Sequence, residues 1–132
     1  MKKEKSCGIV VFKNNKVLII KHNRGHYGIP KGHVEENESE FETAIREVKE
    51  ETNIDAQIIE GFRKVITYSP KENVLKDVVY FIGIAKSFYL KNQIEEVSMA
   101  DFYDFDIALN LITYGDEKSV LEEAIKFYKE KE

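Results

Sequence analysis

The chain has 132 residues, a length typical of one compact domain, and 42% of them are hydrophobic, which is enough for a sizeable core. Its formal net charge is -4, so we do not expect a protein that grips long nucleic acids through broad phosphate neutralisation. The longest apolar stretch, 78–85, is far shorter than the roughly 20 residues that span a bilayer. We therefore expect a single domain over residues 1–132, located in the cytoplasm and not in a membrane.

The first third of the chain predicts a hairpin followed by a loop. Apolar, β-branched runs at 6–12 and 17–20 are separated by Lys-Asn-Asn-Lys, whose asparagines tolerate a left-handed backbone. Cys7, the only cysteine, lies in the first run, so no disulfide can form within the chain and we expect a buried thiol. The segment 24–33 contains three glycines and a proline, which indicates a loop that leads through a short strand into a helix.

The strongest helix signal spans residues 39–51. Apolar residues there recur at offsets of three, four and seven, which predicts one buried stripe on a helix. The stripe consists of Phe41, Ala44, Ile45 and Val48. Ser39, followed three residues later by Glu42, forms a capping box that satisfies two backbone donors at the helix start.

The remainder of the chain predicts two strands and two helices. The strands are expected at 56–68 and 74–87, with Gly83 marking a bulge in the second. A short helix is expected at 104–112. An amphipathic helix should follow Gly115, because apolar residues repeat at helical spacing. These residues are Val120, Leu121, Ala124, Ile125 and Tyr128.

Three glutamates share one face of the helix predicted at 39–51. At 3.6 residues per turn, Glu47, Glu50 and Glu51 lie within an arc of roughly 100°. Arg46 and Lys49 fall on the other flank, so we expect them not to neutralise this face. Because like charges repel, a divalent cation such as magnesium, which prefers oxygen ligands and bridges carboxylates to phosphates, would compensate. The alternative is an acidic face in contact with solvent, and the three glutamates alone favour that alternative.

The spacing of the residues around these glutamates favours a metal site over an acidic face in contact with solvent. The segment 32–54 resembles the Nudix box, in which a glycine, five residues, a glutamate, seven residues and then Arg-Glu-apolar-x-Glu-Glu-x-Gly-apolar follow in order. Every interval is kept, and the matching residues are Gly32, Glu38, Arg46, Glu47, Val48, Glu50, Glu51 and Ile54. Asn53 stands where the family usually has glycine, and asparagine is the commonest substitute where a chain turns left-handed at a helix end.

This resemblance implies an α/β fold in which a mixed β-sheet is sandwiched between α-helices and a loop-helix-loop holds the metal. It also implies an enzyme that hydrolyses a polyphosphate bond in a nucleoside-diphosphate-linked substrate with Mg²⁺, for which Mn²⁺ is the alternative. The implied metal ligands are Gly32, Glu47, Glu50 and Glu51.

The resemblance also implies roles for four other acidic or basic positions. Glu38 and Arg46 would brace the loop, and the position of Arg46 beside Glu42 on the helix predicts an ion pair between them. A fourth acidic position often comes from a distant loop in this family, and Glu96 is the local match, with a charged surface loop as the alternative. A glutamate of the box, Glu47 or Glu50, or else Glu96, would accept the proton of the attacking water.

The flanking residues indicate a substrate class. The segment 28–35, Gly-Ile-Pro-Lys-Gly-His-Val-Glu, is similar to the start of the box in asymmetric diadenosine tetraphosphate hydrolases, and 66–68 and 76–81 resemble that group more loosely. Cleavage of diadenosine tetraphosphate to ATP and AMP is therefore implied. The candidate substrate-binding residues are Lys31, His33, Tyr68, Lys76 and Tyr80. Ordinary solvation in a loop is the alternative for Lys31 and His33.

Aromatic side chains near this segment have competing explanations. Tyr68, at a strand end, can stack on an adenine, whereas Tyr80 lies inside an apolar run and fits the core equally well. His22 and His26 lie in the loop before the box and lack the spacing of metal ligands. We expect these two histidines to be solvated, with a place at the entrance of the site as the alternative.

Other functions of the same box stay open. One is removal of pyrophosphate from a triphosphorylated RNA 5′ end, and another is hydrolysis of damaged nucleoside triphosphates. The acidic net charge argues weakly against a long RNA partner, although a strand end needs only a local site. A nucleotide-sensing module without activity is the rival from a different class, but such modules often lose box carboxylates that are all present here. A small-molecule nucleotide is thus the expected partner, and the sequence indicates no oligomeric state.

Overall fold

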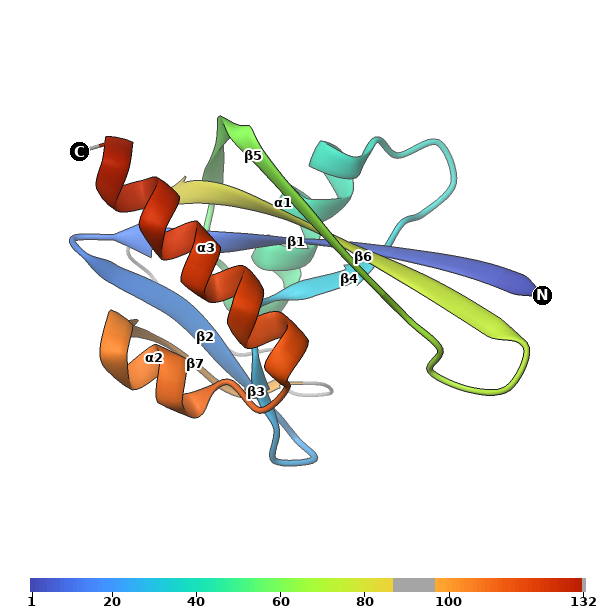
Figure 1. Cartoon of the computed structure of the whole chain (residues 1–132). Coiled ribbons are helices and arrows are strands. Elements are labelled where there is room, and N and C mark those ends of the chain that lie inside the picture. The colour runs from blue at the N-terminus through green and yellow to red at the C-terminus, as the bar shows by residue number, and fades with distance from the viewer. Residues whose placement is uncertain (87–96, 132) are drawn as a thin grey trace.

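The computed structural model describes residues 1–86 and 97–131. In chain order its elements are β1 (Lys2–Lys13), β2 (Lys16–His22), β3 (Tyr27–Gly28), β4 (Lys31–His33), α1 (Glu40–Thr52), β5 (Ala56–Tyr68), β6 (Val74–Ala85), β7 (Val97–Asp104), α2 (Phe105–Leu111) and α3 (Gly115–Lys131). The strands form one mixed sheet, with α1 on one face and α3 across the other (Figure 1). The predicted α/β fold, a mixed sheet between helices, is confirmed. No helix among these residues is long and apolar enough to cross a membrane.

Strand β1 is the centre of the sheet. It runs parallel to β6 on one side, and on the other it pairs antiparallel with both β2 and β4. β5 completes the sheet beyond β6, and β2 also pairs with β3 and β7. The pairing of β4 with β1 fixes the segment just before α1 against the middle of the sheet, and this is where the candidate site forms.

The predicted hairpin is confirmed. Asn14 and Asn15 adopt φ angles of 49° and 62°, the left-handed geometry for which asparagine is suited, and they join β1 to β2. Both strands are longer than their apolar runs. Cys7 is buried in β1 and unbridged, as expected. Strand β7 was not predicted.

The bulge predicted at Gly83 is wrong. The irregularity lies in the partner strand, between Ile59 and Lys64 of β5, where Gly61 has a φ angle of 108°. Gly83 is instead a site of close approach, since a Cβ there would lie 2.9 Å from the Cγ2 atom of Ile9. The predicted strand end at residue 87 lies outside the described residues.

Each face of the sheet carries its own apolar layer. Against α3, the buried residues Leu121, Ala124 and Ile125 pack with apolar side chains of β1, β2 and β6. Against α1, Ala44 and Val48 pack with the alternate side chains of β1 and β6. The amphipathic C-terminal helix is confirmed, since its predicted stripe is the part that packs.

The stripe predicted on α1 is only half correct. Ala44 and Val48 are fully buried, but Phe41 and Ile45 are 41% and 40% exposed. Phe41 still contacts the sheet edge-on through Phe81, at 4.7 Å between ring centroids. The buried stripe is therefore narrower than the periodicity indicated.

Helix α1 ends in the left-handed geometry predicted for Asn53. This residue has φ 64° and ψ 12°, and its N–H donates to the carbonyl of Lys49. Asn53→Gly should keep the free energy of unfolding within about 0.5 kcal/mol of wild type, because glycine adopts this conformation without steric cost. Asn53→Ala should lower it by about 1 kcal/mol, because alanine lacks the short polar side chain through which asparagine tolerates the left-handed backbone. Urea denaturation of both variants measures the difference, and equal losses would show that the backbone conformation is not the constraint.

Candidate functional site

A pocket of about 800 Å³ lies on the α3 side of the sheet, next to the first turn of that helix. Its volume is in the range of small-molecule sites. Eight of the predicted site residues line it: Lys31, Gly32, His33, Glu47, Glu51, Tyr68, Lys76 and Tyr80. Glu50, Glu38 and Arg46 are not in its lining, and Glu96 lies outside the described residues.

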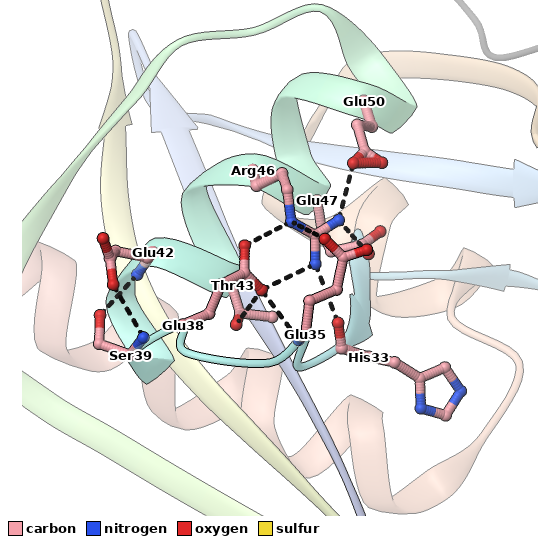
Figure 2. Close-up of polar contacts among 9 residues, drawn as sticks. All are labelled: His33, Glu35, Glu38, Ser39, Glu42, Thr43, Arg46, Glu47 and Glu50. Atoms are coloured by element: carbon pink, nitrogen blue, oxygen red, sulfur yellow. Dashed lines mark hydrogen bonds and ion pairs between the residues drawn. The ribbon is translucent and has the colours of Figure 1, made fainter.

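Arg46 connects the loop before α1 to the acidic face of that helix (Figure 2). Its Nε and Nη2 atoms donate to the two carboxylate oxygens of Glu38, at 2.6 and 3.0 Å, and Nη2 also donates to the carbonyl of His33. Its Nη1 atom donates to Glu47 at 2.9 Å and to Glu50 at 2.7 Å. The planar guanidinium, with five donors, satisfies acceptors from three directions at once.

Two expectations about Arg46 are wrong. Its partner is not Glu42, which instead completes the predicted capping box with Ser39. It also neutralises part of the acidic face, because its long side chain folds back over Glu47 and reaches Glu50 one turn later.

Glu38 is held as a carboxylate by several donors. The Arg46 guanidinium is the largest cause that lowers the pKa of Glu38 to about 2, followed by the backbone N–H of Glu35. The hydroxyl of Thr43 donates to the same carboxylate at 2.8 Å. Glu38 therefore stays ionised at neutral pH and ties the loop to the first turns of α1.

The box glutamates differ in their access to the pocket. A Cβ at Gly32 would lie 2.0 Å from the carboxyl carbon of Glu47, so only glycine lets this carboxylate pack on the backbone of β4. Glu51 is 2% exposed and accepts a hydrogen bond of 2.9 Å from the backbone N–H of Lys31. Glu50 is the outermost of the three, with a side chain that is 43% exposed.

The donor set around Gly32 fits a hard divalent cation, because every candidate ligand is an oxygen. Within residues 1–86 and 97–131, however, no three acidic, histidine or cysteine side chains converge closely enough to hold an ion as they stand. The contacts of Arg46 explain this, since the guanidinium draws Glu47 and Glu50 toward itself. A cation at this face would compete with Arg46 for the carboxylates of Glu47 and Glu50.

The family model for the NUDIX domain matches residues 2–123. The chain belongs to the Nudix family. It is accordingly a pyrophosphohydrolase, of a family that generally uses a divalent metal.

Within the Nudix family, the chain is similar to several individual proteins. The chain is 33% identical to an asymmetrical bis(5′-nucleosyl)-tetraphosphatase from Sus scrofa, over 93% of this chain and 94% of the relative. A relative with the same description from Mus musculus is 29% identical over the same shares. Among solved structures, an Ap4A hydrolase binary complex from C. elegans covers 96% of this chain and 98% of its own, with a TM-score of 0.85 and 24% identity. The last comparison shows a shared fold.

Glu117 is a pocket residue that the sequence analysis missed. It lies in the first turn of α3, is 3% exposed, and accepts three hydrogen bonds. The donors are the backbone N–H of Ile29 at 3.1 Å, the ammonium of Lys31 at 2.9 Å and the hydroxyl of Tyr80 at 2.5 Å. A signal was present, because position 117 falls three and four residues before Val120 and Leu121, on the stripe that packs against the sheet.

Of the two explanations offered for Tyr80, the structure favours a place in the core. Its ring has no exposed surface and belongs to the apolar layer under α3, so it offers no face on which a base could stack. Burial, together with the charge of Glu117, raises the pKa of the Tyr80 phenol well above its ordinary value. The phenol therefore stays protonated and donates to Glu117 beneath the pocket.

The two loop histidines form part of the pocket wall. His22 and His26 stack at 4.0 Å between ring centroids, and His26 also contacts Tyr114, which is 58% exposed. Both rings are half-buried and line the pocket, which favours the alternative, a place at the entrance of the site. Burial lowers the pKa of His22 to about 4 and also lowers that of His26. Both rings are therefore neutral at pH 7. Tyr114 was not predicted.

The burial of Glu117 among three donors predicts a large effect of a conservative substitution. Glu117→Gln retains the shape of the side chain but points an N–H₂ group at groups that are themselves donors, and it removes the partner of Lys31. The free energy of unfolding should fall by about 1 to 3 kcal/mol in urea denaturation.

Glu123→Gln is the matched control on the same helix. Glu123 pairs with Lys64 at 2.8 Å, but both side chains are about half exposed. This variant should lose no more than about 0.5 kcal/mol. Equal losses in the two variants would contradict a special role for the buried carboxylate.

Proposed function

We propose that this Nudix hydrolase cleaves dinucleoside polyphosphates and cuts diadenosine tetraphosphate asymmetrically to ATP and AMP, with Mg²⁺ or, in its place, Mn²⁺. The observation that carries the proposal is the order of groups along the pocket. Lys31 binds the buried Glu51 through its backbone, and Lys76 stands directly opposite the exposed Tyr68 in the sheet register. The pocket thus offers carboxylates for the metal, lysines for the phosphates and an aromatic ring for the base. The name of the relative from Sus scrofa agrees with this substrate.

In this proposal, Glu47, Glu50, Glu51 and the carbonyl of Gly32 would hold the divalent ion. When bound, such an ion would neutralise phosphate charge and lower the pKa of a coordinated water. The ammonium groups of Lys31 and Lys76, with the imidazole of His33, bind phosphate oxygens and orient the chain for in-line attack. Tyr68 stacks on a base.

The remaining residues of the box position those that react. Glu38 and Arg46 brace the loop through the hydrogen bonds in Figure 2. Glu47 or Glu50, or alternatively Glu96, takes the proton from the attacking water. Because the leaving group is a nucleotide, no covalent intermediate with the protein is needed.

Product analysis tests the substrate. The protein is incubated with Mg²⁺ and, separately, with diadenosine tetraphosphate, a set of nucleoside triphosphates and a triphosphorylated RNA, and the products are separated by chromatography. Equal amounts of ATP and AMP from diadenosine tetraphosphate are expected. Two molecules of ADP would contradict asymmetric cleavage, and faster release of pyrophosphate from RNA or from a triphosphate would assign the site to that substrate. No product from any of them would favour a nucleotide sensor.

A substitution at Glu50 tests the assignment of the box. Glu50→Gln should lower kcat by at least about a hundredfold, because the variant loses a metal ligand or a base. The unfolding midpoint should stay close to that of wild type, since the side chain is 43% exposed and glutamine keeps an oxygen that can accept from Arg46. Glu60→Gln, at an exposed position of β5, is the control and should retain full activity. A fully active Glu50→Gln variant would show that Glu50 has neither role.

A further inference from the structure

Ser6 has a buried hydroxyl that no group of the protein satisfies. Its residue is 1% exposed, and within residues 1–86 and 97–131 its Oγ is the only buried side-chain oxygen or nitrogen without a hydrogen-bond partner. Other buried hydroxyls in this part of the chain are paired, as in Thr43 and Thr52. An unpaired buried hydroxyl costs stability, so packing in the apolar core does not explain why a serine stands at this position.

The position of Ser6 on β1 places its side chain in the floor of the pocket. Ser6 stands opposite His33 of β4 on one side and Val78 of β6 on the other, and the pocket lining includes all three. Two residues along β1 in one direction, the partner on β4 is Lys31, and two residues in the other direction, the partner on β6 is Lys76. Residues in register and residues two apart point to the same face of a sheet. Ser6 therefore lies between the two lysines, on their face.

The neighbours of Ser6 identify the kind of atom that its hydroxyl would meet. Lys31, His33 and Lys76 are its neighbours on the same face of the sheet and line the same pocket. Burial, together with the charge of Lys31, lowers the pKa of Lys76. An anionic oxygen between the lysines would relieve their repulsion. Lys31 uses one donor on Glu117 and has two more for a ligand. The edge of a base, which is neutral, would gain less from the two lysines than an anionic phosphate oxygen would.

We propose that Ser6 is a further substrate-binding residue, whose hydroxyl donates to a non-bridging phosphate oxygen held between Lys31 and Lys76. The inference rests on the proposed function, because it takes the ligand to be a polyphosphate. The Ser6 hydroxyl is a neutral donor at the floor of the pocket. A third cationic side chain at this buried position would be costly, because its charge would have to be buried.

Ser6→Ala gives a double signature that a structural role would not. Removal of an unsatisfied hydroxyl should leave the unfolding midpoint of the substrate-free protein unchanged or higher. At the same time, KM for diadenosine tetraphosphate should rise about tenfold, since hydrogen bonds to charged groups are strong, while kcat changes less than about threefold. Ser119→Ala is the matched control, because Ser119 is exposed on α3 and donates to the carbonyl of Gly115. It should change neither KM nor kcat.

Calorimetry with simple ligands separates phosphate from nucleoside contacts. Wild type and Ser6→Ala are each titrated with inorganic tripolyphosphate in the presence of Mg²⁺, and the variant should bind it about tenfold more weakly. Titration with adenosine should show no difference between the two proteins. Weaker binding of adenosine alone would overturn the phosphate assignment. A lower unfolding midpoint with unchanged binding of both ligands would make Ser6 structural and overturn the inference.

The same measurements distinguish failure of this inference from failure of the proposed function. If wild type forms no product from diadenosine tetraphosphate, the proposed substrate is wrong, and the tripolyphosphate titration still tests Ser6. If wild type is active and Ser6→Ala matches it in KM and in tripolyphosphate binding, only the inference about Ser6 fails.

Discussion

The segment 29–31, which precedes α1, is held by two buried carboxylates that come from helices on opposite faces of the sheet. Glu51 of α1 accepts the backbone N–H of Lys31, while Glu117 of α3 accepts both its ammonium and the backbone N–H of Ile29. Burying a carboxylate is costly unless donors satisfy it, so each glutamate is stable only with this segment in place. The two helices and β4 therefore depend on one another, and the pocket lies where they meet.

The acidic face of α1 shows how such a charge cluster is kept in a folded protein. Glu47 and Glu50 would repel each other at helical spacing, and Arg46 offsets that repulsion by bonding to both. The same guanidinium is anchored at its other end by Glu38, whose depressed pKa keeps it charged. An incoming cation would thus compete with Arg46 at an existing negative site and would not have to create one. The anchoring by Glu38 would keep Arg46 close while the cation binds.

Features that depend on neighbouring residues could be predicted from the sequence. The asparagine turn between β1 and β2, the capping box at Ser39 and the left-handed end at Asn53 are all local, and all three formed as expected. The family followed from the register of the box, which is also local. Strand β7 was not predicted, because its sequence has no strand pattern as clear as those of the other long strands.

Features that depend on distant partners could not be predicted. Glu117 and Tyr80 are 37 residues apart and meet only through the packing of α3 on the sheet. The position of the bulge in β5 likewise depends on the pairing of that strand with β6. The partners of Arg46 lie within 13 residues along the chain, but which of the nearby carboxylates it binds depends on how the loop before α1 folds. Eight of the predicted site residues line one pocket, although they come from separate parts of the chain, and their roles toward a ligand stay predictions.

The charge balance of the pocket bears on how the proposed substrate would be recognised. Lys31 is already paired with Glu117, and Glu47 and Glu51 bring negative charge to the same pocket. The chain as a whole is also acidic, with a formal net charge of -4. Long-range attraction of a bare polyphosphate is therefore weak, and recognition must come from short-range donors and from a divalent ion bound with the phosphates. A neutral hydroxyl such as that of Ser6 suits this arrangement, because it binds an anionic oxygen without adding a charge that would have to be buried or paired in the substrate-free protein.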